Sequence, residues 1–134
     1  DPRVLPQFIK RAIIEKKIYM FDKGKTVRTW TYISDVIIML LNIIQYGKST
    51  FYNVCGKENI SIFKIAKLVS SKFDNIPLEI RSKKLKFTNS KPSILKISPK
   101  KYFSEFKKIK LIKFSNGLER LILWNKLCID KKKM

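Results

Sequence analysis

The stretch VRTWTYISDV, residues 27–36, carries the pattern that decides how this chain is interpreted. Side chains alternate between the two faces of a strand, so an extended chain here places Arg28, Trp30 and Tyr32 on one face. A face with a guanidinium and two large aromatic rings is either an exposed surface or the wall of a binding site. From the spacing alone, packed aromatic rings beside a solvated Arg28 are the more common outcome.

Helical and extended patterns alternate along the rest of the chain, which predicts an α/β fold. The predicted helices cover residues 2–15, 34–46, 60–73 and 98–106, and a last one starts near residue 115. Besides the quoted stretch, the predicted strands are residues 17–21, 49–54 and 77–81. A turn at Gly24 separates the first strand from the quoted one, and residues 82–92 form a polar, lysine-rich loop.

Side chains that accept hydrogen bonds from free backbone amides mark the predicted helix starts. Asp1 is placed as the cap of the first helix, with Pro2 in its first turn. Asp35, with the serine before it, starts the second helix, Ser61 caps the third, and Ser115 caps the last. The apolar run from Val36 to Leu41, extended by two isoleucines, is too short to span a bilayer and is predicted to be a buried helix.

The composition favours one globular domain with a strong positive charge. The chain has 134 residues, of which 45% are hydrophobic, and its net charge is +20. Such a charge is compatible with an alternative function, that of a small basic nucleic-acid-binding module. Lysine, however, far outnumbers arginine, whereas base recognition and phosphate clamping favour the arginine fork. We therefore expect no specific nucleic-acid partner.

The chain lacks the residues that most catalytic sites need. It contains no histidine, its ten acidic residues are scattered, and its four glycines form no phosphate-binding loop. Cys55 and Cys128 have no metal-type spacing, which predicts reduced thiols in a cytoplasmic protein with no metal site. A binding role remains: Arg28 suits a phosphate or pyrophosphate, and Tyr19 or Phe21 on a neighbouring strand suits a base.

Five segments in order resemble one known family. They are DPRVLPQFIKRAI, IYMFDKGKTVRTWTYISDV, TFYNVCGKENISIFKIAKLV, KPSILK and FSNGLERLILW. Together they look like the carboxyl-terminal part of an NAD-dependent nucleotide-sugar epimerase/dehydratase of the extended short-chain dehydrogenase/reductase family. The UDP-glucuronate decarboxylase and dTDP-glucose 4,6-dehydratase branch is the most similar. By this resemblance, residues 1–129 are a substrate-binding lobe and residues 130–134 a basic tail.

The resemblance implies a set of substrate-binding residues. Arg28 takes the position that binds the diphosphate of the nucleotide sugar, which is of the UDP or dTDP type. The base-side positions fall on Tyr19, Met20 and Phe21, and Arg3 matches a segment close to the substrate pocket. In the late loop, Lys91 stands where relatives usually carry an arginine. The following Ser93 replaces an acidic residue, and Asp35 is implied to be structural.

The resemblance also implies what lies outside this chain. The half that binds NAD, with a glycine-rich turn and a Tyr-x-x-x-Lys pair, is expected to precede Asp1. Tyr19 and Lys23 have the spacing of the Tyr-x-x-x-Lys pair, but we interpret this match as chance. The chain alone is then expected to be inactive, and the intact enzyme to be a homodimer with no membrane partner. A non-catalytic remnant of the enzyme is the remaining alternative. Separated from its other half, the lobe is expected to expose apolar surface on residues 4–13 or around Trp30.

Overall fold

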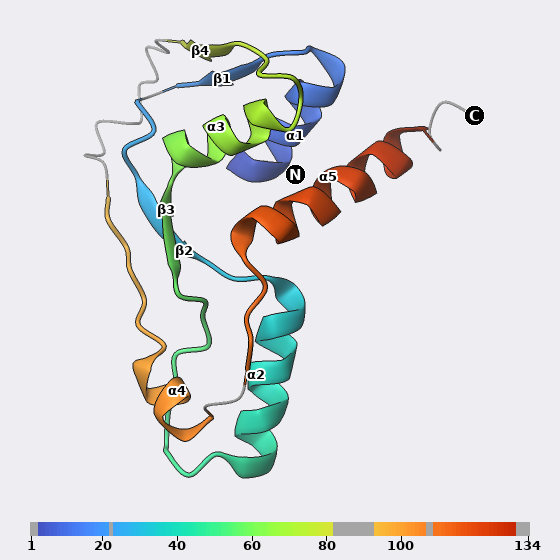
Figure 1. Ribbon diagram of the computed structural model, residues 1–134. Helices are drawn as coiled ribbons and strands as arrows, with labels where there is room; N and C mark the ends of the chain where they lie inside the picture. The colour runs from blue at the N-terminus through green and yellow to red at the C-terminus, as the bar shows by residue number, and fades with distance from the viewer. Residues whose placement is uncertain (1–2, 22, 82–92, 107–108, 131–134) are drawn as a thin grey trace.

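The computed structural model describes residues 3–21, 23–81, 93–106 and 109–130 (Figure 1). The elements are α1 (Val4–Ile14), β1 (Ile18–Met20), β2 (Val27–Trp30), α2 (Ile33–Tyr46), β3 (Glu58–Ser61), α3 (Ile62–Ser71), β4 (Leu78–Ile80), α4 (Lys100–Glu105) and α5 (Phe114–Asp130). This order confirms the predicted α/β class. The predicted caps at Asp1 and Pro2, and the predicted loop over residues 82–92, lie outside the described residues.

The strands form two separate pairs. β1 lies parallel to β4, and β2 lies antiparallel to β3, with a further bridge between Val27 and Ile94 (Figure 1). The prediction that the strand of Tyr19 and Phe21 neighbours the strand of Arg28 is therefore wrong. Gly24 has a φ of +62° and its carbonyl accepts a hydrogen bond from the Phe63 amide. This turn directs the chain toward the start of α3, so no hairpin closes.

The core lies where α1, α3, β1 and the first turns of α5 meet. Its buried apolar residues are Phe8, Ile9, Ala12, Ile18, Met20, Ile60, Ile65, Ala66, Val69, Leu118 and Ile122. The apolar stripe of α1 faces this core, as its helical spacing predicts. The hydroxyl of Ser61 accepts a hydrogen bond from the Lys64 amide at 3.2 Å, which confirms the predicted cap of α3.

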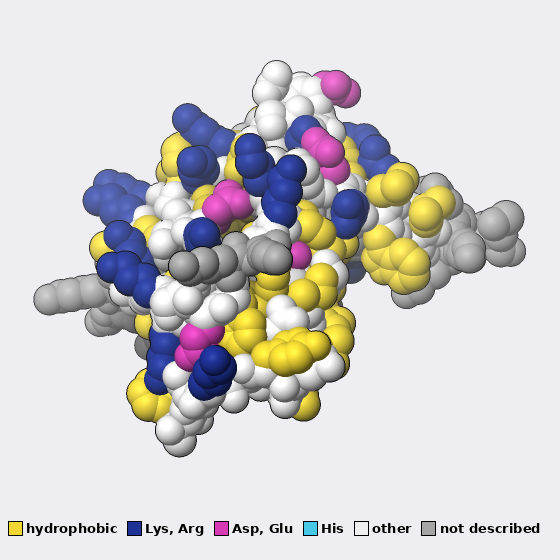
Figure 2. Space-filling view, turned by 60° about the horizontal axis from the view of Figure 1, so that its bottom comes forward, with side chains coloured by type: hydrophobic (Ala, Val, Ile, Leu, Met, Phe, Trp, Pro, Cys, Tyr) yellow, Lys and Arg dark blue, Asp and Glu magenta, His cyan; other side chains and the backbone are white. Residues whose placement is uncertain are grey.

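The prediction of a buried helix is wrong for α2. Its buried residues are Asp35 and Met39, whereas Leu41 is 58% exposed and Ile44 is 81% exposed. The helix carries apolar residues around most of its circumference, and such a helix is covered only when neighbours lie on every side. Figure 2, which brings the α2 end of the molecule forward, shows hydrophobic side chains gathered on that face. Exposed apolar side chains thus gather on α2 and also on α5, whereas the apolar residues among 4–13, and Trp30, are buried or partly buried.

Three other local predictions are also wrong. α2 begins at Ile33, and the buried carboxylate of Asp35 accepts a hydrogen bond from the Ile112 amide at 2.9 Å, so Asp35 does not cap the helix. α5 begins at Phe114, which places Ser115 inside its first turn. Residues 49–54 form no strand. The strand that follows them, β3, was missed because polar residues occupy most of its short length.

Candidate functional site

The face of β2 that carries Arg28 and Trp30 lines a cavity of about 800 Å³. The cavity lies between the start of α1, strand β2 and the start of α5. β2 ends at Trp30, but the backbone stays extended at Tyr32, with φ −78° and ψ 143°. Tyr32 lines the same cavity, and so do Thr31 and Ile33, so the alternation of faces ends after Trp30. Arg28, Trp30 and Tyr32 nevertheless belong to one cavity wall.

The aromatic side of this wall is held by α5. The rings of Trp30 and Phe114 meet edge to face with centroids 5.5 Å apart, and Trp30 Nε1 donates to the Ile60 carbonyl at 3.4 Å. At Gly117, an added Cβ would stand 2.8 Å from the Tyr32 ring. The absence of a side chain at Gly117 lets the backbone of α5 contact that ring directly. These contacts fix two of the aromatic rings that line the cavity.

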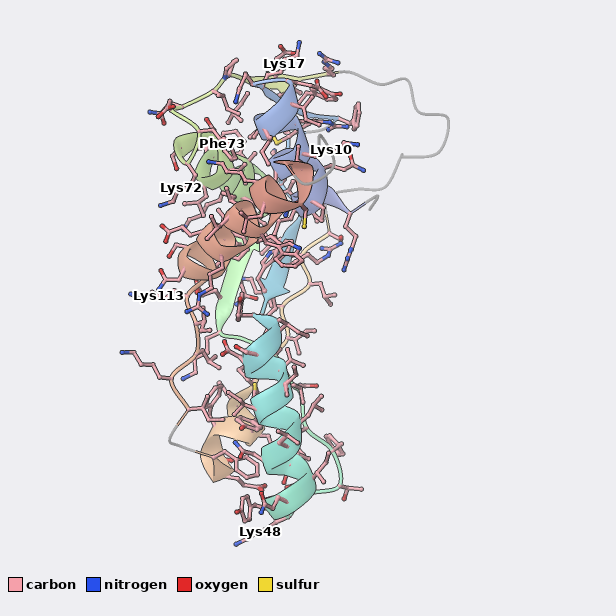
Figure 3. All side chains as sticks on the ribbon, turned by 90° about the vertical axis from the view of Figure 1, so that its right-hand side faces the viewer. Lys10, Lys17, Lys48, Lys72, Phe73 and Lys113 are labelled. Carbon is pink, nitrogen blue, oxygen red and sulfur yellow. The ribbon has the colours of Figure 1, made fainter. Side chains whose placement is uncertain are left out.

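The charged residues that line the cavity are all cationic. Arg3, Arg28 and Lys113 contribute to its lining, and no carboxylate among the described residues does. Glu58 binds the Phe114 amide at 2.7 Å, and Glu58 and Asp35 line an adjoining, smaller cavity. Figure 3 shows Lys113 extending outward from the start of α5, so its charge acts at longer range. A cavity with this charge distribution favours an anionic ligand.

The guanidinium of Arg28 is held in place by neutral acceptors. Its Nη1 donates to the carbonyl oxygens of Val27 at 2.8 Å and Ser93 at 2.9 Å, and its Nη2 donates to the Ser93 hydroxyl at 2.7 Å. The ion pairs of the described chain, Lys72 with Glu119 and Arg81 with Glu79, do not include Arg28. Its orientation is fixed while its positive charge stays uncompensated by the described carboxylates.

Comparison with known proteins shows which proteins this chain resembles in sequence and in fold. Residues 1–55, which contain α1, β1, β2 and α2, match the family described as the NAD dependent epimerase/dehydratase family. Over these residues the chain resembles the NAD-dependent epimerases and dehydratases. It is also 28% identical, over 67 residues, to a dTDP-4-dehydro-6-deoxy-D-allose reductase of Streptomyces bikiniensis. That match covers 50% of the chain and 21% of the reductase.

Solved structures of a dehydratase and an epimerase share the fold of the chain. The dTDP-glucose 4,6-dehydratase of Bacillus anthracis, solved with NAD, matches with a TM-score of 0.78 and 17% identity over 92% of this chain. The UDP-glucuronic acid 4-epimerase of Bacillus cereus, solved with UDP-glucuronic acid and NAD, matches with a TM-score of 0.77 and 20% identity over 95% of it. The chain spans 39% of the dehydratase and 40% of the epimerase. The chain therefore shares its fold with part of each of these two enzymes.

The structure brings some of the predicted binding residues together and separates others. Arg3 and Arg28 line the same cavity. The side chain of Met20 is 3% exposed and belongs to the core. Tyr19 and Phe21 meet edge to face with centroids 6.0 Å apart, outside the lining of the Arg28 cavity. The base-side role of these three residues stays a prediction, and Lys91 lies outside the described residues.

Sequence reasoning missed a second group of cationic contacts around Tyr19. The guanidinium carbons of Arg11 and Arg81 each lie 3.8 Å from the centroid of the Tyr19 ring. Arg11 also lines a groove of about 850 Å³ between α1 and the end of α5, together with Glu15 and Cys128. Figure 3 shows Lys10, a further residue of this groove, where α1 and α5 come close. No local pattern marks Arg81, because it is 62 positions from its partner Tyr19 along the chain.

The remaining chemistry of the described residues is limited. They contain no group of three histidine, cysteine or acidic side chains able to hold a metal ion. Cys55 and Cys128 are free thiols, and burial raises the pKa of the Cys55 thiol, which disfavours its reactive thiolate. Among the described helices, none is long and apolar enough to cross a membrane.

Proposed function

We propose that this chain is the nucleotide-sugar-binding lobe of an NAD-dependent epimerase/dehydratase, of the UDP-glucuronate decarboxylase or dTDP-glucose 4,6-dehydratase branch. One observation carries the proposal: the cationic cavity wall of β2, within the matched residues 1–55, presents a fixed guanidinium and aromatic rings. A guanidinium pairs bidentately with phosphate oxygens, and aromatic rings suit the apolar faces of a sugar or base. Arg28 is the proposed diphosphate ligand, with Arg3 beside it.

The described residues do not fit NAD itself. Dinucleotide binding needs several glycines in one turn between a strand and a helix. Here Gly24 lies in the turn before β2, Gly47 ends α2, and Gly117 lies inside α5. We therefore propose that a separate dinucleotide-binding half supplies NAD and the proton-transferring residues. The described lobe contributes substrate binding and no hydride chemistry.

The proposed ligand class follows from the diphosphate clamp and from the relatives. The Bacillus cereus relative was solved with UDP-glucuronic acid, and the Bacillus anthracis relative is a dTDP-glucose 4,6-dehydratase. UDP-glucuronic acid and dTDP-glucose are therefore the ligands to test first. A nucleoside without phosphate is expected to bind much more weakly, because it offers no anion to the three cationic residues.

The test is equilibrium binding by isothermal titration calorimetry with Arg28→Ala and a charge-matched control, Lys72→Ala. Lys72 pairs with Glu119 on the surface and does not line the cavity. Loss of a charge-assisted hydrogen bond at Arg28 is expected to weaken binding by about 1.5 to 3 kcal/mol. The control is expected to bind as the unaltered chain does. Equal affinities for the unaltered chain and Arg28→Ala would instead favour the non-catalytic remnant.

A further inference from the structure

We propose that Ser93 is a positioning residue, whose hydroxyl orients the guanidinium of Arg28 toward the phosphates of a bound nucleotide. This inference rests on the function proposed above. Ser93 lies 65 positions from Arg28 in the sequence, yet its carbonyl and its hydroxyl both accept hydrogen bonds from the guanidinium. The sequence marks Ser93 only as a residue that stands where relatives usually carry an acid.

The contacts of Arg28 leave a defined set of donors for a ligand. A guanidinium has five N–H donors, and three of those of Arg28 are used by Val27 and Ser93. Within the described residues, the Nε–H and the second Nη2–H have no partner. Two donors on a rigid, planar group match two oxygens of one phosphate. Ser93 thus engages the terminal nitrogens and leaves the other donors for an anion.

The Ser93 hydroxyl is not needed to hold its own segment in place. The Ser93 carbonyl accepts the Val27 amide at 3.1 Å, and the Leu95 amide donates to the Val27 carbonyl at 3.1 Å. These backbone bonds anchor the segment beside β2 whichever side chain stands at position 93. The hydrogen bond from Nη2 to the hydroxyl therefore restricts the rotamers of the Arg28 side chain. Without it, Arg28 would lose more conformational entropy when it binds a ligand.

The chemistry of a hydroxyl suits this role better than that of a carboxylate would. An aspartate at this position would form an ion pair with Arg28 and reduce the positive field in the cavity. A serine fixes the same nitrogen through a neutral oxygen, so the full charge remains to attract a phosphate. Ser93 thus orients the guanidinium of Arg28 without neutralising its positive charge.

The experiment measures UDP and uridine affinities for Ser93→Ala, Ser93→Thr and Arg28→Ala by NMR titration. Ser98→Ala is the matched control, because Ser98 follows in the same segment and its hydroxyl contacts the Lys100 amide instead. We expect Ser93→Ala to weaken UDP binding about 2- to 10-fold and to leave uridine binding unchanged. Ser93→Thr keeps a hydroxyl and is expected to restore UDP binding to within about twofold.

The outcomes distinguish a failure of the positioning role of Ser93 from a failure of the proposed nucleotide-sugar binding. If Arg28→Ala weakens UDP binding while Ser93→Ala does not, the positioning role is overturned and the proposed function stands. If Ser93→Ala weakens UDP and uridine equally, Ser93 only supports the cavity, and the positioning role is again overturned. If UDP does not bind, or if Arg28→Ala has no effect on its binding, the proposed function fails and the role of Ser93 fails with it.

Discussion

Helices α1 and α2 are both rich in apolar residues, yet the structure uses them in opposite ways. α1 presents one stripe and buries Phe8, Ile9 and Ala12 against the core. α2 carries apolar residues around most of its surface and leaves most of them exposed (Figure 2). An apolar pattern thus predicts a helix, whereas burial depends on the elements that lie beside it.

Hydrogen bonds connect the far end of α2 to α4, beside a small group of buried side chains that includes Met39 and Tyr102. The Asn42 amide group donates to the buried Tyr102 hydroxyl at 2.9 Å. Just beyond α2, the hydroxyls of Ser49 and Tyr52 donate to Glu105 at 2.7 and 2.6 Å. This end of the molecule therefore lies apart from the main core and combines individual hydrogen bonds with the burial of Met39 and Tyr102.

The largest expected effect is a loss of stability on substitution in α1 that substitution in α2 does not cause. Ile9 is 0% exposed and Ile44 is 81% exposed. Ile9→Ala is expected to lower the free energy of unfolding by about 2 to 5 kcal/mol, because it leaves a cavity in the core. Ile44→Ala is expected to change it by about 0.5 kcal/mol or less. Urea unfolding followed by circular dichroism measures both, and similar losses for the two variants would show that α2 is covered in solution.

A smaller effect is expected at the contact between α2 and α4. Tyr102→Phe keeps the buried ring and removes the hydroxyl that accepts from Asn42. We expect a loss of about 0.5 to 1.5 kcal/mol in the same unfolding measurement. Tyr46→Phe is the matched control, because Tyr46 lies on α2 and is exposed. A loss in the control as large as that for Tyr102→Phe would count against the proposed importance of this hydrogen bond.

The smallest expected effect is the pH dependence of the Glu105 contacts. Hydrogen bonds from Tyr52, then from Ser49, hold the pKa of the Glu105 carboxyl below its ordinary value. A carboxyl whose pKa is lowered by folding stabilises the fold above its unfolded pKa. That contribution is lost as the pH falls through the folded pKa. Acid titration of the melting temperature is therefore expected to be slightly steeper for the unaltered chain than for Glu105→Gln; identical curves would contradict this.

Local patterns predicted a substantial part of the fold and one wall of the site. The alternation of Arg28, Trp30 and Tyr32 predicts that they share a face, and all three line one cavity. The helical stripe and Ser61 cap of α3 are likewise encoded within one short segment. Such features depend on neighbours close in sequence, so propensity and periodicity are enough to find them.

The features that sequence reasoning missed depend on distant partners. Phe114 completes the aromatic wall from a helix near the other end of the chain, and Ser93 reaches Arg28 across 65 positions. The separation of β1 from β2 likewise follows from their pairing with β4 and β3. No periodicity within one segment encodes which other segment will lie beside it, so these contacts required the structure.

The contact between Arg28 and Ser93 also has a consequence for the order of folding. Closing so long a loop costs conformational entropy, and contacts distant in sequence form slowly. We therefore expect the anion-binding geometry to form late, after the helices, whose backbone hydrogen bonds are local in sequence. In stopped-flow refolding, the ability to bind UDP should then lag behind the recovery of helical circular dichroism, and simultaneous recovery of the two signals would contradict this order. Nucleotide binding would thereby report that the whole chain has folded.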